Sequence, residues 1–121
     1  MGIAVIGEND EEGVLQVISG LLSRFDNVDL GYILGSLFDK LVVAVVTSER
    51  LQPYDGMKFA TKLERLIKRT IKRECNVNVR ILQSSPSSFQ HEVIRRGKLV
   101  FCRSHARRLI YEADILSKCS N

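Results

Sequence analysis

The most continuous apolar pattern in the chain predicts two adjoining strands. Leu30–Leu34 runs into Gly35 and Ser36, and a short polar turn then leads into the β-branched run Leu41–Thr47. Two apolar strands joined this tightly are typical of an antiparallel hairpin. Because the second strand is apolar at nearly every position, we expect it to be buried on both faces or central in its sheet.

Helical periodicity follows the acidic stretch Asn9–Glu12 and recurs at about Met57–Glu74, the longest predicted helix. A loop with Pro53 and Gly56 precedes that long helix. A short helix is expected at Ser87–Arg96, where Gly97 stops it.

The last predicted helix runs from a cap at Ser104 to about Leu116. Its apolar residues recur on one face, which we expect to turn inward. They are Ala106, Leu109, Ile110, Ala113 and Leu116.

Two further strands, Val77–Leu82 and Lys98–Cys102, complete the element order (β)αββαβαβα. The strand in parentheses is the short apolar run Ile3–Ile6. We predict an α+β fold, with a mixed or antiparallel sheet of three to five strands and helices mainly on one face. At this length, residues 1–121 are expected to form a single domain.

The net charge of +4 is modest, but its distribution along the chain is uneven. Cations repeat on one side of helix 57–74, and we call them the basic stripe: Lys58, Lys62, Arg65, Arg69 and Lys72. Such a stripe suits the phosphates of a nucleic acid. The alternative is a solvated helix face on which Glu64 and Lys68 pair. No aromatic residue is interleaved with these cations, so base stacking and sequence-specific recognition are not expected.

The three cysteines are widely spaced and form no CxxC pair, which favours reduced thiols in a cytoplasmic protein. The opening apolar run is too short for a signal peptide, and no run approaches the roughly 18 apolar residues of a membrane span. We therefore expect a cytoplasmic protein without a membrane segment.

Two stretches together carry a family resemblance. The first is the strand that ends in Gly35 and Ser36. The second, from Val77 to about Asp114, contains a strand, a polar turn with proline, a helix ending in Arg-Gly-Lys, a short apolar strand and an Ala-Arg-Arg helix. In this order they resemble the minimal nucleotidyltransferase (MNT) domains of the DNA polymerase β-like nucleotidyltransferase superfamily.

The resemblance implies metal-assisted nucleotidyl transfer. An Asp-x-Asp pair on the second strand and a third carboxylate on a later strand would hold Mg²⁺ and a nucleoside triphosphate, while the Gly-Ser corner binds phosphate. Carried over to this sequence, Gly35 and Ser36 match the corner and Asp39 lies near the first carboxylate. The second carboxylate falls on Leu41 or Val42, and the third falls on Asn78.

The resemblance therefore implies a degenerate member, with a residual nucleotide site at Gly35, Ser36, Asp39 and Asn78 and with no catalytic or metal residues. We expect it to have lost metal-dependent catalysis and to act by binding. Because such domains are often encoded beside a small helical protein of the HEPN type, an antitoxin-like role with that partner is implied.

Two other functions stay open. One is an active nucleotidyltransferase that transfers a nucleoside monophosphate, and only this reading requires Mg²⁺ and a triphosphate as cofactors. The other is a non-specific nucleic-acid-binding protein that uses helix 57–74. A homodimer is also compatible with the sequence.

Overall fold

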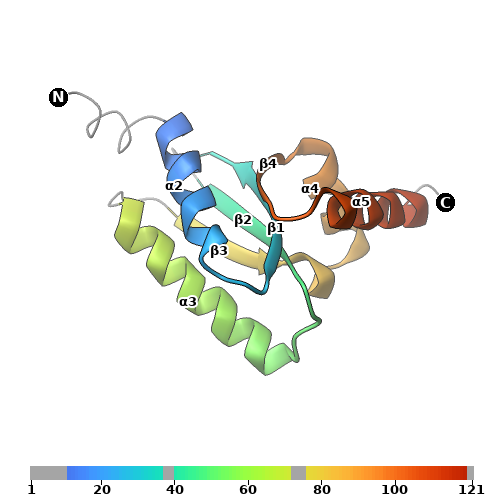
Figure 1. The fold of residues 1–121 in the computed structure, drawn as a ribbon, viewed down its shortest axis with the longest axis horizontal. Coiled ribbons are helices and arrows are strands. Elements are labelled where there is room, and N and C mark those ends of the chain that lie inside the picture. Colours follow the sequence, from blue (N-terminus) through green and yellow to red (C-terminus); the bar gives the residue numbers. More distant parts are fainter. Residues whose placement is uncertain (1–10, 37–39, 72–75, 120–121) are drawn as a thin grey trace.

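The structure, a computed structural model, describes residues 11–36, 40–71 and 76–119. Figure 1 shows the order of its elements along the chain. They are α2 (Glu11–Ser23), β1 (Val28–Gly35), β2 (Lys40–Thr47), α3 (Pro53–Ile71), β3 (Asn76–Ile81), a 3₁₀ turn (Leu82–Ser84), α4 (Ser87–Arg96), β4 (Lys98–Cys102) and α5 (His105–Cys119).

The described strands form one mixed sheet in the order β3-β2-β1-β4. Strand β1 pairs antiparallel with β2 and with β4, and β2 pairs parallel with β3. Helix α3 supplies the crossover that a parallel pair requires. The α+β class, the mixed sheet and the predicted hairpin are thereby confirmed, while the predicted strand at Ile3–Ile6 lies outside the described residues.

Helices cover both faces of the sheet, as Figure 1 shows. Side chains of α2 and α3 pack with Leu41, Val43 and Val45 of β2 on one face. Ala44 and Val46 of the same strand pack on the other face with residues of α4 and α5. The sequence placed the helices mainly on one face. The structure places two on each, because a strand that is apolar on both sides requires cover on both sides.

Helix α3 begins at Pro53, inside the segment predicted to be a loop. Proline is tolerated in the first helical turn, where its missing N–H would have no helical acceptor. Gly56 is buried there, and a Cβ at this position would lie 3.3 Å from Cδ1 of Ile81. The longer helix places Tyr54 on the same element as the basic stripe.

Helix α5 is rotated relative to the sequence prediction. Its inward side chains are Tyr111 and Ile115, which are almost fully buried. All five residues predicted to face inward are exposed: Ala106, Leu109, Ile110, Ala113 and Leu116. The apolar pattern alone therefore gave the wrong face of this helix.

Polar contacts to the sheet explain the orientation of α5. Arg107 forms an ion pair with Asp29 at 3.3 Å and donates a second hydrogen bond to the carbonyl of Thr47 at 3.3 Å. The hydroxyl of Tyr32 donates to a carboxylate oxygen of Glu112 at 2.6 Å. Since a half-buried charge without these partners is costly, the polar residues fix the inward face.

The free edge of β3 is occupied by a side chain from α3. Oε2 of Glu64 accepts a hydrogen bond from the backbone N–H of Val79 at 2.9 Å. The sequence left open an ion pair between Glu64 and Lys68, and in the structure this carboxylate accepts the hydrogen bond from a strand amide.

Two buried tyrosines predict how stability depends on pH. Burial, followed by the hydrogen bond to Glu112, raises the pKa of Tyr32 far above its ordinary value. Burial also raises the pKa of Tyr111. Unfolded tyrosines lose their protons near pH 10, so above that pH the unfolded chain binds fewer protons than the folded one and stability falls. Each group contributes a slope of up to about 1.4 kcal/mol per pH unit.

Denaturant unfolding from pH 8.5 to 11 checks this prediction, and Tyr32→Phe and Tyr111→Phe should each flatten the decline. Tyr54→Phe, at an exposed ring, controls for the loss of one phenol hydroxyl. An equal decline in all four proteins would contradict the prediction.

Candidate functional site

The corner of the hairpin is closed by the backbone itself. Gly35 has φ +102°, and a Cβ at this position would lie 2.2 Å from the carbonyl oxygen of Lys40. The backbone N–H of Ser36 donates to that same oxygen at 2.9 Å. Glycine is therefore required here by the turn alone, and the Ser36 amide that a phosphate would use is already bonded within the hairpin.

The register of the sheet brings two predicted carboxylate positions together. Val42 is paired with Leu34 on one side and with Asn78 on the other. Asn78 thus lies one strand away from Val42, at the same end of the sheet as Gly35. Asp39, which the resemblance places near the first carboxylate, lies outside the described residues. Within the described ranges, no three His, Cys, Asp or Glu side chains are grouped to hold a metal ion.

The basic stripe lies along the outer surface of α3. Lys58, Lys62, Arg65 and Arg69 are all exposed, and Lys72 falls outside the described residues. Among described residues, none of these four cations forms an ion pair with a carboxylate.

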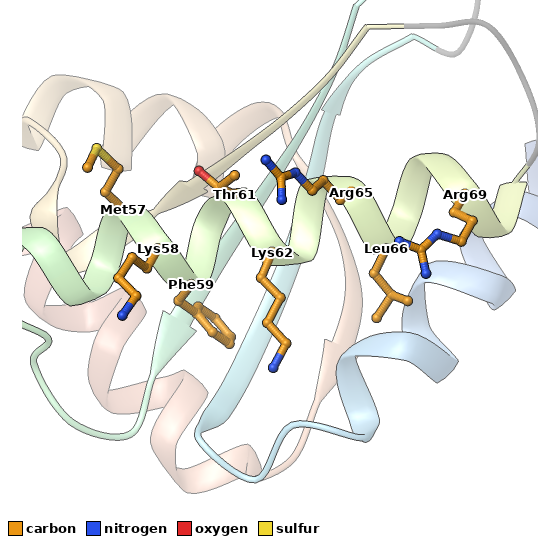
Figure 2. Close-up of a pocket in the computed structure, with 8 residues that line it drawn as sticks. All are labelled: Met57, Lys58, Phe59, Thr61, Lys62, Arg65, Leu66 and Arg69. Atoms are coloured by element: carbon orange, nitrogen blue, oxygen red, sulfur yellow. The ribbon is translucent and has the colours of Figure 1, made fainter.

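These cations line an open hollow of about 650 Å³. Figure 2 shows Lys58, Phe59 and Lys62 extending from one side of α3, and Thr61 and Arg65 from the other. Every lining residue comes from α3, so the hollow is the uneven outer surface of one helix. Such a surface suits an extended polyanion better than an enclosed small molecule.

Aromatic rings accompany these cations, which corrects the sequence prediction. Tyr54 is 65% exposed, and Nζ of Lys58 lies 5.1 Å from the centre of its ring. Nζ of Lys62 lies 5.9 Å from the ring of Phe25, which packs edge-on against Phe59 at 5.5 Å. The sequence signal that was missed is Pro53, because a helix starting there includes Tyr54.

A polar cluster that the sequence did not reveal lies where β2 ends, away from the hairpin corner. Thr47 is fully buried, and its N–H and carbonyl both bond the side-chain amide of Gln83, at 2.9 and 2.6 Å. Arg107, held by Asp29, also reaches this carbonyl. These polar groups form hydrogen bonds with one another. The cluster therefore joins β2 to α5 and is not a candidate binding site.

The element order and the mixed sheet form a nucleotidyltransferase-like α+β fold. The sequence model of the family "Polymerase beta, Nucleotidyltransferase" matches residues 16–106. The chain therefore belongs to the polymerase β nucleotidyltransferase family. Among the curated proteins, none matches this sequence.

Solved structures share the fold at low sequence identity. A chain of the MntA–HepT toxin–antitoxin complex is 17% identical with a TM-score of 0.61, and the match covers 94% of this chain and 85% of that one. A complex of a tri-AMPylated HEPN toxin with an MNT antitoxin from Shewanella oneidensis gives 17% identity, a TM-score of 0.61 and coverages of 96% and 86%. Another Shewanella oneidensis structure gives 15% identity, a TM-score of 0.67 and coverages of 89% and 86%.

No helix in the described part of the chain combines the length and the apolar character needed to cross a membrane. The predicted cytoplasmic location stays a prediction.

Proposed function

We propose that this chain is a nucleotidyltransferase-fold protein that has lost metal-dependent transfer and acts by binding a helical partner of the HEPN type, as an antitoxin. The observation that carries the proposed loss of transfer is the pairing of Val42 with Asn78 near the hairpin corner, because neither side chain is a carboxylate. Two solved relatives of this fold come from toxin–antitoxin complexes, and one of those pairs an MNT antitoxin with a HEPN toxin.

The side chains at this corner do not fit a two-metal site. Mg²⁺ is held by hard oxygen ligands, and in-line transfer between two ions needs several carboxylates to clamp both. Val42 offers no ligand, and Asn78 offers a neutral amide oxygen. Of the three carboxylates that the family uses, only Asp39 would remain in this chain. One carboxylate cannot hold two ions. A residual nucleotide contact at Gly35, Ser36, Asp39 and Asn78 is a further part of the proposal, and titration with ATP tests it.

A transfer assay tests the loss of catalysis. The purified chain, Mg²⁺ and α-³²P-labelled ATP are incubated with a helical protein of the HEPN type, and we expect no label on either protein. Asp39→Ala should behave identically, because no transfer depends on this carboxylate. Label that appears with the wild-type chain and disappears with Asp39→Ala would establish the active-enzyme alternative.

The surface of α3 favours a second candidate function, non-specific binding of single-stranded nucleic acid. Four exposed cations on α3 have no carboxylate partner among the described residues, and the first of them, Lys58, lies beside the exposed ring of Tyr54. Cations that follow a backbone, together with an aromatic ring for stacking, are the elements of such sites.

If this second function holds, affinity for a single-stranded oligonucleotide should fall steeply with salt. Four neutralised phosphates give a slope of log K against log[salt] of roughly −3, from about −0.7 per contact. Lys62→Glu/Arg69→Glu should reduce the slope by at least about 1.4. Fluorescence anisotropy at several salt concentrations measures both quantities.

Arg95→Glu/Arg96→Glu is the matched control. It makes the same change in net charge at two exposed residues of α4, which covers the other face of the sheet. Equal loss in both double variants would point to bulk charge, and absence of binding at low salt would end this candidate.

A further inference from the structure

The outer face of α5 carries an apolar stripe that no part of the described structure covers. We call it the outer stripe: Ala106, Leu109, Ile110, Ala113 and Leu116. Leu109 and Ile110 are each 66% exposed, and Leu116 is 42% exposed. At roughly 100° per residue, the centre of the stripe lies on the order of 180° from the buried pair Tyr111 and Ile115. The helix therefore has two apolar faces, and the fold uses one.

The charges that border the outer stripe are already neutralised. On one border, Glu112 forms an ion pair with Arg108 at 3.0 Å. On the other, Asp114 pairs with Lys118 at 3.2 Å. A helix that binds anionic lipid or nucleic acid presents an excess of cations beside its contact face. A border without net charge suits an apolar protein surface instead.

The size of the stripe argues against a second copy of the chain that docks through α5 alone. A helix of 15 residues is about 22 Å long and about 10 Å wide, so its outer half offers on the order of 350 Å². A symmetric pair joined through α5 alone would bury about 700 Å², below the roughly 1,200 Å² of a stable interface. A partner that binds the outer stripe stably must therefore also contact residues of this chain outside α5.

We propose that the outer stripe enters an apolar groove between two helices of a partner protein, so that α5 packs as an additional helix of that partner. This inference rests on the proposed function, because it takes the helical partner proposed there as the occupant. In Figure 1, α5 lies on the side of the sheet away from α3, and its outer face points away from the sheet. The small side chains of Ala106 and Ala113 permit close approach between helix axes, which is set by the residues at the contact.

Paired substitutions on two helices test the surface. The chain is co-expressed with a helical protein of the HEPN type from the genome that encodes it, and the affinity of the purified pair is measured by calorimetry. Leu109→Glu/Ile110→Glu should weaken binding by at least about 100-fold, since two central apolar contacts are replaced by charges. Tyr54→Glu/Met57→Glu is the matched control on α3, where the exposed fractions are 65% and 61%. Its affinity should stay within about threefold of wild type.

The outcomes of this experiment separate failure of the inference from failure of the proposed function. Thermal melting checks that both double variants are folded, and Leu109→Ala/Ile110→Ala provides a milder pair if the charged one is not. A complex that survives substitution on α5 but fails with the α3 control overturns the inference and leaves the proposed function standing. No complex with the wild-type chain overturns both. A wild-type homodimer that Leu109→Glu/Ile110→Glu converts to a monomer overturns the inference, because the occupant would then be a second copy.

Discussion

Replacement of Leu63 by alanine is expected to lower the free energy of unfolding by roughly 2–5 kcal/mol. Leu63 lies on α3 with no exposed surface, packed in the cluster that α2 and α3 form with the sheet. The truncation removes apolar contact and leaves a cavity, because the strands beneath α3 are held by their ladder and cannot close it. Urea unfolding should show a lower midpoint with an unchanged slope.

Leu109→Ala is the matched control for this prediction. Both leucines lie on amphipathic helices, and the sequence pattern placed Leu109 inward as well. Because Leu109 is 66% exposed, its truncation should change stability by no more than about 0.5 kcal/mol. A loss comparable to that of Leu63→Ala would mean that α5 packs through the face that the sequence predicted.

Gly35→Ala is expected to destabilise the hairpin by about 2–3 kcal/mol. The backbone at Gly35 has φ +102°, a conformation that side-chain-bearing residues rarely adopt. The new Cβ would also lie 2.2 Å from the carbonyl oxygen of Lys40, a backbone atom that the Ser36 amide holds in place. Thermal and urea unfolding measure the loss.

Gly20→Ala is the matched control for Gly35→Ala, and it is expected to raise stability instead of lowering it. Gly20 is exposed in the last turn of α2, and a Cβ there would have no atom within 4 Å. Alanine should therefore stabilise the protein by about 0.5–1 kcal/mol, because it restricts the unfolded chain and favours the helix. If the two substitutions had effects of the same sign, the local geometry of Gly35 would not be the cause.

The sheet was predictable from the sequence because its strands have one consistent pattern. The run Leu41–Thr47 is apolar at successive positions, and this indicates a strand in the middle of a sheet. The same run also predicts that helices cover both faces of the sheet, because its apolar side chains point to both sides. The placement of helices on two faces followed from β2, although the element order alone did not reveal it.

The orientation of α5 was not predictable from periodicity, because apolar residues occur on opposite sides of this helix. The buried face has only two large apolar residues, Tyr111 and Ile115, whereas the outer stripe has five apolar residues. A count of apolar residues on each face therefore predicts the wrong face as buried. What decides the orientation is the set of polar partners that Arg107 and Glu112 find on the sheet. Those contacts join residues about 80 positions apart, and no local pattern records them.

The candidate site was predictable only as far as single residues. The sequence matched Gly35 and Ser36 to a phosphate corner, and the structure gives each a role in closing the turn. The pairing of Val42 with Asn78 required the register of a parallel ladder across α3, which the sequence does not specify. The ring of Tyr54 beside Lys58 required the true start of that helix.

The hydrogen bond from Val79 to Glu64 has a consequence for how copies of this chain can assemble. Strand β3 is one of the two edge strands of the described sheet, and its amides are where an incoming strand would begin a continuous β-structure. An approaching carbonyl oxygen at Val79 would meet a carboxylate of the same sign of charge, already seated on the amide that it needs. The chain is thus protected against edge-to-edge polymerisation at this strand.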